Sequence, residues 1–550
     1  MDGGRRARRA LVLVALLGVA AAACGDDSGD DATSRDQAGA EQPASATAPT
    51  SVPEAEDDVD PRGVVRWGAD LSGAQTGATM FDPFQSRIRT ADLDEQWLIY
   101  GSLLRQTPDR ELVPELAESA TIVDPQTIEV VLREGVVFSD GTPFDAEAVK
   151  AGIERNMSAP PPRAQFRAEL NDVAAIEVTG PRSLTLRLSR PTAGAVYSLL
   201  AGQETFIVSP AAVAAGADLN AEPVGAGPFV LETYEPERRL VYAKNERYWN
   251  AADVRLAGIE FVHVPGGPAR VNALRSGAVD IVQVSLNDLP ALRGSEYEVS
   301  AETSESSWLW MPVCKAQPPL SDVRVRRALN MGLDRDAIIA SLLEGEGEPA
   351  WGLWPEGSPY FHEGLRERYA YDPDQARALL AEAGYGDGFT VTVMPIANDP
   401  IAGRWAEVAQ AQWRDIGVDV ELVPSSNFVN DLYIDNRAQM GALAAAGGGL
   451  NQIAGPYRKG SSGNLCQYDN PALNELMARL ASVPDGSPEA VQAWKEAQDL
   501  VVGEALSIFG AFVPRVFAWD PDVAADVEFV IHAGGISAVP EFTGMYAKMR

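Results

Sequence analysis

The chain has 550 residues, and its 45 Lys and Arg against 78 Asp and Glu give a formal net charge of -33. A chain this acidic lacks the basic surface with which proteins bind nucleic acids. It holds 3 histidines and 3 cysteines, which argues against a histidine-rich metal site and a disulfide-rich scaffold. The composition is that of a globular protein, long enough for about two to four domains.

The N-terminus is built like an export signal. Arginines between residues 5 and 9 form a basic head, and residues 10–23 form an apolar run that would span roughly 21 Å as a helix. This is short of the roughly 30 Å of a bilayer core, so we interpret residues 1–23 as a signal peptide. The sequence Ala21-Ala22-Ala23-Cys24 resembles a lipobox, with Ala21 in place of the usual Leu, and predicts a lipid on Cys24. A plain secretory cleavage is the alternative, and either process places the mature chain outside the cytoplasm.

Residues 24–61 are acidic and rich in Ser, Thr, Ala, Pro and Gly, with no aromatic residue. Such a segment cannot offset the entropy of its own ordering, so we expect a disordered tether behind the lipidated Cys24. The rest of the chain is also acidic and would be repelled by anionic lipids. We therefore expect the membrane attachment to come from the lipid alone.

From Val64 onward, β-rich runs alternate with amphipathic helical patterns, which indicates an α/β protein whose sheets are covered by helices. In the N-terminal half, residues 127–132 and 183–188 alternate like half-buried strands. Asp145 is the expected N-cap of a helix that runs through Arg155.

In the C-terminal half, residues 324–343 have apolar side chains at helical spacing and predict one or two helices, with a break near residues 332–335. Two helix-then-strand units follow, and a glycine ends each helix. The predicted helices are 374–383 and 405–416, ended by Gly384 and Gly417, and the predicted strands are 388–393 and 418–423.

Patterns for catalysis and cofactor binding are weak. The glycine-containing loop at residues 225–228 lacks the Lys-Ser/Thr of a phosphate loop, and its Pro228 removes a backbone donor. None of the histidines stands in a recognisable hydrolase motif. We therefore predict no catalytic residues, no cofactor and no bound metal.

Nine motifs in a fixed order span most of the chain. They are FDP at 81–83, IYGSLL at 99–104, LAES at 116–119, VLREGVVFSDGTPFDAEAVKAGIER at 131–155, PVGAGPFVL at 223–231, KNERYWN at 244–250, RVNALRSGAVDI at 270–281, PPLSDVRVRRALNMGLDRDAI at 318–338 and YDPDQARALLAEAGYGDGF at 371–389. Together they resemble the extracytoplasmic solute-binding proteins of family 5, which serve ABC importers of peptides and nickel. The resemblance covers nearly all of residues 64–550.

The resemblance implies a two-lobed periplasmic-binding-protein clamp of type II, the large peptide-binding class, with an extra α+β domain. A solute would be enclosed between lobes that close about a hinge. By analogy, lobe I would comprise residues 62–95, 222–306 and 515–550, the extra domain residues 96–221, and lobe II residues 307–514.

The function that the resemblance implies is capture of a solute outside the cell. We expect a monomeric, non-enzymatic lipoprotein that binds an oligopeptide or similar bulky solute and delivers it to the permease subunits of an ABC importer. Alternatives are a receptor for a non-peptide solute (an oligosaccharide, a siderophore or a drug-like compound), a hydrolase with the same clamp, or a surface sensor.

Four tryptophans are candidates to contact the solute. Trp308 and Trp310 alternate on one strand and so face the same side, while Trp351 and Trp354 lie in the loop WGLWPEGSP, which cannot easily bury both. Aromatic walls with a few polar anchors hold ligands in enclosed sites. Core packing is the alternative for all four.

Relatives that hold short peptides fix the amino end with an Asp after a Gly-Trp pair, and the carboxyl end with an Arg before the equivalent of helix 405–416. Here residues 439–452 contain neither Trp nor Asp, and Asn398 and Asp399 stand near the place of the Arg. The comparison with relatives therefore argues against a dipeptide receptor. The small residues at 442–449 suggest a wide or shallow pocket instead. The remaining candidate contacts are Phe81, Gln85, Arg404, Gly448 and Asn451.

Cys314 and Cys466 are the thiols that remain beside Cys24. In the resembling fold both regions approach the cleft between the lobes, and an oxidising location favours a disulfide between them. In the chain-entropy model, such a bridge across about 150 residues would contribute roughly 4–5 kcal/mol. Two buried free thiols are the alternative.

Overall fold

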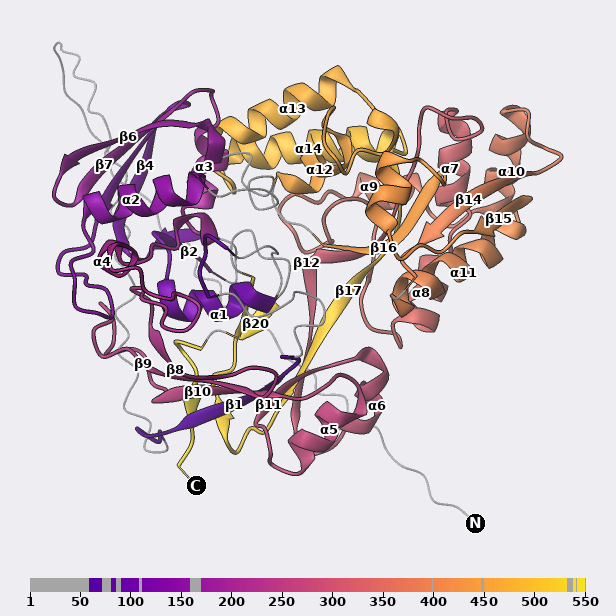
Figure 1. Ribbon diagram of the computed structural model, residues 1–550. Helices are drawn as coiled ribbons and strands as arrows, with labels where there is room; N and C mark the ends of the chain where they lie inside the picture. The colour runs from indigo at the N-terminus through magenta and orange to yellow at the C-terminus, as the bar shows by residue number, and fades with distance from the viewer. Residues whose placement is uncertain are drawn as a thin grey trace, which may run out of the picture. The chain divides into compact units, whose positions relative to one another are not determined.

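The computed structural model describes residues 59–71, 81–85, 91–107, 111–158, 170–397, 399–446, 450–531, 538–540 and 542–549. They form an α/β structure around a sheet with the strand order β15-β14-β16-β12-β17-β11-β1-β10-β9-β8, and β13 also pairs with β17 (Figure 1). A separate four-stranded sheet has the order β4-β5-β7-β6. The described residues from residue 59 onward belong to one compact unit of the chain.

One end of the large sheet, here called the first wing, contains five short strands. They are β1 (Val64–Ala69), β8 (Phe229–Glu235), β9 (Arg239–Lys244), β10 (Gly258–His263) and β11 (Ile281–Val284). Strand β1 is parallel to both β10 and β11, whereas β8, β9 and β10 are antiparallel. Trp67 lies within 6.2 Å of the rings of Phe261 and Phe517 in the buried core of this wing.

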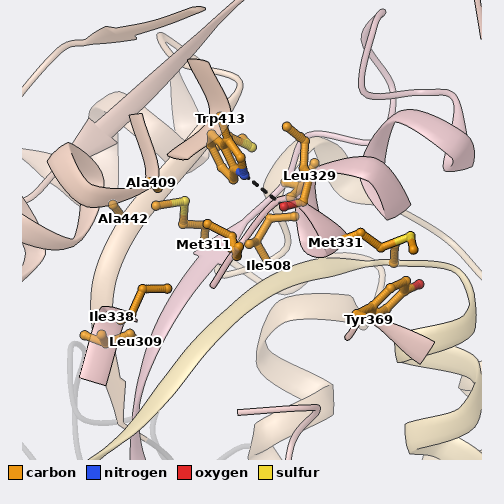
Figure 2. Close-up of a cluster of buried hydrophobic side chains, with 14 of the residues drawn as sticks. Leu309, Met311, Leu329, Met331, Ile338, Tyr369, Ala409, Trp413, Ala442 and Ile508 are labelled. Atoms are coloured by element: carbon orange, nitrogen blue, oxygen red, sulfur yellow. Dashed lines mark hydrogen bonds between the residues drawn. The ribbon is translucent and has the colours of Figure 1, made fainter. Parts of the chain in front are cut away.

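The opposite end of the sheet, here called the second wing, has the parallel strands β14 (Phe389–Pro395), β15 (Val418–Leu422) and β16 (Met440–Ala446). The helices of one face are α7 (Val323–Met331), α8 (Arg335–Leu342), α10 (Pro373–Glu382) and α11 (Pro400–Arg414). Figure 2 shows their shared core, in which the Trp413 indole donates a hydrogen bond of 2.8 Å to the Leu329 carbonyl. A second buried cluster involves α12 (Asn451–Tyr457), α13 (Pro471–Ser482) and α14 (Pro488–Gly503).

Two long antiparallel strands, β12 (Glu298–Pro312) and β17 (Ser507–Trp519), carry the sheet from one wing to the other. At one end β17 pairs with β11 of the first wing, and at the other end β12 pairs with β16 of the second wing. Their mutual register shifts between Thr303 and Trp308. The two ends of β17 also serve different cores, because Phe517 belongs to that of the first wing and Ile508 to that of the second.

The four-stranded sheet and its helices form a body here called the subdomain. Its strands are β4 (Ala117–Asp124), β5 (Thr127–Leu132), β6 (Val173–Gly180) and β7 (Ser183–Leu188), and its helices include α2 (Ala146–Met157), α3 (Ala193–Leu199) and α4 (Pro210–Ala214). The four strands, α2 and α3 have a hydrophobic cluster of their own, whereas Ala212 of α4 belongs to the core of the first wing. As predicted, Asp145 caps α2, accepting a hydrogen bond of 2.9 Å from the Ala148 amide.

The subdomain is attached to the first wing by buried polar contacts. Arg155 on α2 forms two hydrogen bonds, of 2.9 and 2.8 Å, with the Asp82 carboxylate in the turn after β1. Glu115 accepts hydrogen bonds from the Tyr248 hydroxyl and, at 3.2 Å, from the Trp249 indole. These contacts explain why the motifs that contain Asp82 and Arg155 occur together without implying that either binds a solute.

The helix and strand predictions for the C-terminal half are confirmed within a few residues. Helices α7 and α8 are broken at Gly332, as expected for residues 324–343. Gly384 and Gly417 follow α10 and α11 with φ of 88° and 83°, a left-handed conformation that glycine adopts without strain. The sequence then enters β14 and β15, which completes the predicted order.

The remaining elements are short. They are α1 (Ala91–Tyr100), β2 (Leu104–Gln106), β3 (Leu112–Pro114), α5 (Pro268–Arg275), α6 (Leu289–Leu292), β13 (Glu348–Pro349), α9 (Gly364–Arg368), β18 (Ala524–Ala525), β19 (Phe529–Ile531), β20 (Ala538–Pro540) and β21 (Tyr546–Ala547). Within the described part of the chain, no helix combines the length and apolar character needed to cross a membrane.

Candidate functional site

Trp308 lies where β12 passes between the wings. It pairs with Ala445 near the end of β16 and with Phe512 on β17, and its ring centroid is 6.4 Å from that of Phe512. The side chain is 4% exposed, and among the described residues its indole N–H has no hydrogen-bond partner. A buried donor without a partner costs on the order of 1–3 kcal/mol.

Trp310 faces the same side of β12, as the strand alternation predicts, and it is 8% exposed. Both tryptophans belong to the buried cluster under α12–α14. Leu309 between them faces the other core of the second wing, shown in Figure 2. The crossing strands therefore separate a tryptophan-bearing face from an aliphatic one.

The two tryptophans in the loop at residues 351–358 differ in burial. Trp354 is completely buried, with ring centroids of Tyr360 and Trp494 at 4.7 and 5.0 Å, so the loop buries this tryptophan of the pair. Trp351 is half-buried and donates a hydrogen bond of 3.1 Å to Glu356. The Arg335 guanidinium lies 4.8 Å from the centre of its ring.

The turn after β1 contains two further candidates. Phe81 is completely buried against Tyr234, at 5.3 Å between ring centroids, and its carbonyl accepts a hydrogen bond from Tyr100. Complete burial argues against direct solute contact for both Phe81 and Trp354. Gln85 is exposed, and its amide donates a hydrogen bond of 3.1 Å to Asp82.

The structure also places residues around α11 and α12. Arg404 is exposed on α11 and donates a hydrogen bond of 2.6 Å to the Ser341 carbonyl. Asp399 is the N-cap of α11, with hydrogen bonds from the Ile401 and Ala402 amides, so its carboxylate is engaged in helix capping. Asn451 begins α12, and its side chain, Gly448 and Cys24 lie outside the described residues.

Cys314, just after β12, and Cys466 are joined in a disulfide, with their Cα atoms 5.3 Å apart. Lys315 follows the first cysteine and was not identified from the sequence. Its amine donates hydrogen bonds of 2.9 and 3.1 Å to the carbonyls of Val313 and Leu506, and lies 5.1 Å from the centre of the Tyr468 ring. Burial lowers the pKa of Lys315 to about 7, and the positive charge of Arg326 adds to this effect.

The geometry therefore brings Trp308, Trp310 and Trp354 into one cluster but does not join them to Phe81, Gln85 or Arg404. Solute contact by the candidates stays a prediction. In the described part of the chain, no group of three His, Cys, Asp or Glu side chains is placed to hold a metal ion.

The chain matches a known protein family over residues 111–464. The family described as "Bacterial extracellular solute-binding proteins, family 5 Middle" matches residues 111–464. A curated relative, the glutathione-binding protein GsiB of Salmonella paratyphi A, is 27% identical over 422 residues, which cover 74% of this chain and 81% of that protein.

Solved structures show the same fold. The binding protein AgaA of A. tumefaciens R10, in complex with agropinic acid, is 26% identical with a TM-score of 0.67, covering 84% of this chain and 94% of that one. The dipeptide-binding protein of Pseudoalteromonas sp. SM9913, in complex with Met-Leu, is 21% identical with a TM-score of 0.69, covering 88% of this chain and 100% of that one. The predicted type II binding-protein fold of the large peptide and nickel class is confirmed.

The family match covers more than half of the chain, and the relatives named above are binding proteins. The chain therefore belongs to family 5 of the bacterial extracellular solute-binding proteins, the binding components of ABC importers, and is a binding protein rather than an enzyme.

Proposed function

We propose that the chain is a lipid-anchored receptor that captures an oligopeptide or similar bulky solute between its two wings and delivers it to the permease subunits of an ABC importer. The observation that carries the proposal is the pair β12 and β17, which links two wings with separate cores. Two cores joined by two strands can move as rigid bodies about the strands, as clamp closure requires.

In this proposal the first wing corresponds to lobe I, the subdomain to the extra domain, and the second wing to lobe II. The boundary at residues 306 and 307 falls inside the register shift of β12. The boundary at residues 514 and 515 falls where β17 passes from the second wing to the first. Bending is easiest at the register shift of β12, because the regular pairing of the two strands is interrupted there.

The solute class follows from which anchors are present. Asn398 and Asp399 stand near the place of the Arg that holds the carboxyl end in relatives, and residues 439–452 contain no acidic side chain, so the charged anchors for the two ends of a dipeptide are missing. The Trp308 indole N–H is a buried donor without a partner among the described residues, and it would donate to a peptide carbonyl once movement of the wings exposes it. GsiB, named for binding glutathione, supports a peptide-like solute as well.

A thermal-unfolding screen of the purified full-length chain tests the solute class. We expect glutathione or peptides of about three to five residues to raise the unfolding midpoint, because a ligand that binds the folded state stabilises it by mass action. An oligosaccharide and a siderophore serve as the non-peptide arm. A shift with these compounds alone would replace the peptide proposal with the non-peptide receptor.

The role of Trp308 is tested with the solute that the screen identifies. Trp308→Phe keeps the aromatic ring and removes the N–H, so we expect affinity to fall by roughly 5- to 30-fold, the effect of one lost hydrogen bond in a site. Trp405→Phe is the matched control, because its N–H is also buried and unpaired among the described residues but its ring faces Gly510 in the other core. Equal affinities of both variants and the wild type would show that Trp308 is a core residue.

A further inference from the structure

Helix α3 of the subdomain packs against helix α13 of the second wing, as Figure 1 shows. The two helices belong to different cores. Ala193 and Val196 of α3 are buried in the subdomain cluster, whereas Leu473 and Met477 of α13 are buried in the cluster beneath α12–α14. The contact can therefore open without exposing either core.

The tightest point of this contact is Gly194. A Cβ atom at this position would lie 1.8 Å from the carbonyl oxygen of Val483 and 2.3 Å from its carbonyl carbon. Real Cβ atoms do not approach backbone this closely, so the two segments meet only because residue 194 has no side chain. Gly194 is buried accordingly.

The backbone that Gly194 meets is held in place. Val483 ends α13, and the next residues are fixed by the Tyr360 hydroxyl, which donates a hydrogen bond of 2.7 Å to Asp485. Ser487 then caps α14 by accepting a hydrogen bond of 3.2 Å from the Ala490 amide. A side chain at residue 194 would therefore push the subdomain away from the second wing rather than displace a soft loop.

The subdomain is bound firmly to the first wing through Arg155 and Asp82 and through Glu115 and Tyr248. Contact between α3 and α13 consequently joins the first-wing side of the molecule to the second wing through elements other than β12 and β17. The structure shows this contact formed, and movement of the wings about the crossing strands would open it.

We propose that the α3–α13 contact is a latch that holds the wings in the arrangement seen in this structure, and that Gly194 is the positioning residue that allows it to form. The inference rests on the proposed clamp function. A contact present in one of two states shifts the population toward that state, and solute affinity rises with the fraction of binding-competent molecules. The latch thus stabilises this arrangement of the wings at a place other than the crossing strands.

The test uses Gly194→Ala in the full-length chain. Alanine is the better helix former, so α3 and the subdomain should fold at least as well as in the wild type. Gly180→Ala is the matched control, because a Cβ there would meet only Ser183, at 3.8 Å, in the same subdomain. Fluorophores attached at the exposed positions Val213 and Ile434 report the distance between subdomain and second wing by energy transfer.

We expect the wild type and Gly180→Ala to share a short-distance population, and Gly194→Ala to reduce it about tenfold or more. Tyr360→Phe, which removes the hydrogen bond from the Tyr360 hydroxyl to Asp485, is a second variant. It should reduce the short-distance population a few-fold. The energy-transfer measurement needs no solute, so it tests the latch even when no solute for the clamp is found. An unchanged population in the folded Gly194→Ala variant, or a wild type without a short-distance population, would overturn the latch.

Discussion

Asp82 is the buried residue on which the attachment of the subdomain depends most. Its side chain is 2% exposed and its carboxylate is paired with Arg155, which is 22% exposed and lies 4.6 Å from the centre of the Phe84 ring. Removing one partner of a buried ion pair leaves the other charge unsatisfied, which is far more costly than loss of a surface pair.

We therefore expect Asp82→Asn to lower the free energy of unfolding by about 3 kcal/mol, measured by urea denaturation. Glu118→Gln is the control, because Glu118 and Arg182 form an ion pair in which the side chains are 60% and 41% exposed, respectively. The control should change stability by less than about 1 kcal/mol. Similar effects of the two variants would contradict the structural role given to Asp82.

Lys315 gives a pH-dependent prediction. Its pKa is about 7 in the folded chain and 10.5 for an unperturbed lysine. Between pH 7 and pH 10.5 the unfolded chain binds more protons than the folded chain, so the free energy of unfolding rises with pH across this window. Below about pH 7 the amine is charged in both states, and the destabilising effect of burying its charge is complete.

Lys315→Met should raise the free energy of unfolding at pH 6.5 by on the order of 2 kcal/mol. This is less than the full pKa shift would give, because the side chain keeps some contact with solvent. The gain should shrink as the pH approaches 10. Urea denaturation at several pH values measures it, with Lys459→Met, a lysine 67% exposed, as the control. A gain that is independent of pH would show that Lys315 stays neutral or is solvated in the folded chain.

At the scale of elements, the disulfide ties the end of β12 to the segment between α12 and α13. Because the cysteines are 152 residues apart, the bridge restricts a long loop of the unfolded chain. The double variant Cys314→Ser/Cys466→Ser should lower the unfolding free energy by about 4–5 kcal/mol. Mass measurement without reductant provides the check on the bond itself: alkylation of both thiols in the wild type would rule the bridge out.

The sequence predicted elements whose cues are local. Asp145 before α2 and the glycines after α10 and α11 act through backbone conformation and hydrogen bonds within a few residues, so they can be identified from a short window. The length of β12 could not be predicted, because polar residues interrupt its apolar alternation in the middle of the strand.

The candidate site was predicted less well, for a physical reason. The loop sequence indicates that its two tryptophans are not both easily buried, but it does not tell which one is, because Trp494, the partner of Trp354, comes 140 residues later. Burial of a loop side chain depends on such distant contacts, which no local pattern contains. For the same reason Lys315 was not identified from the sequence, since its neighbours Leu506 and Tyr468 lie far from it along the chain.

At the scale of the whole molecule, the lipid anchor is a proposal that one substitution tests. Cys24→Ala removes the acceptor of the lipid, and because one hydrophobic attachment is expected, we predict that the chain moves from the membrane fraction to the soluble extracytoplasmic fraction. Cell fractionation followed by immunoblotting measures the distribution. A variant that stays with the membrane would indicate a second attachment, by the uncleaved apolar segment or by the folded body.

The central claim is that this family 5 protein holds a peptide-like solute between its wings. Native mass spectrometry of the full-length chain, expressed in a rich medium, purified without denaturant and then incubated with a mixed peptide library, tests it most directly. We expect a noncovalent adduct whose released mass fragments as one or more peptides. A chain that carries no adduct after incubation, or that releases a non-peptide compound, would contradict it.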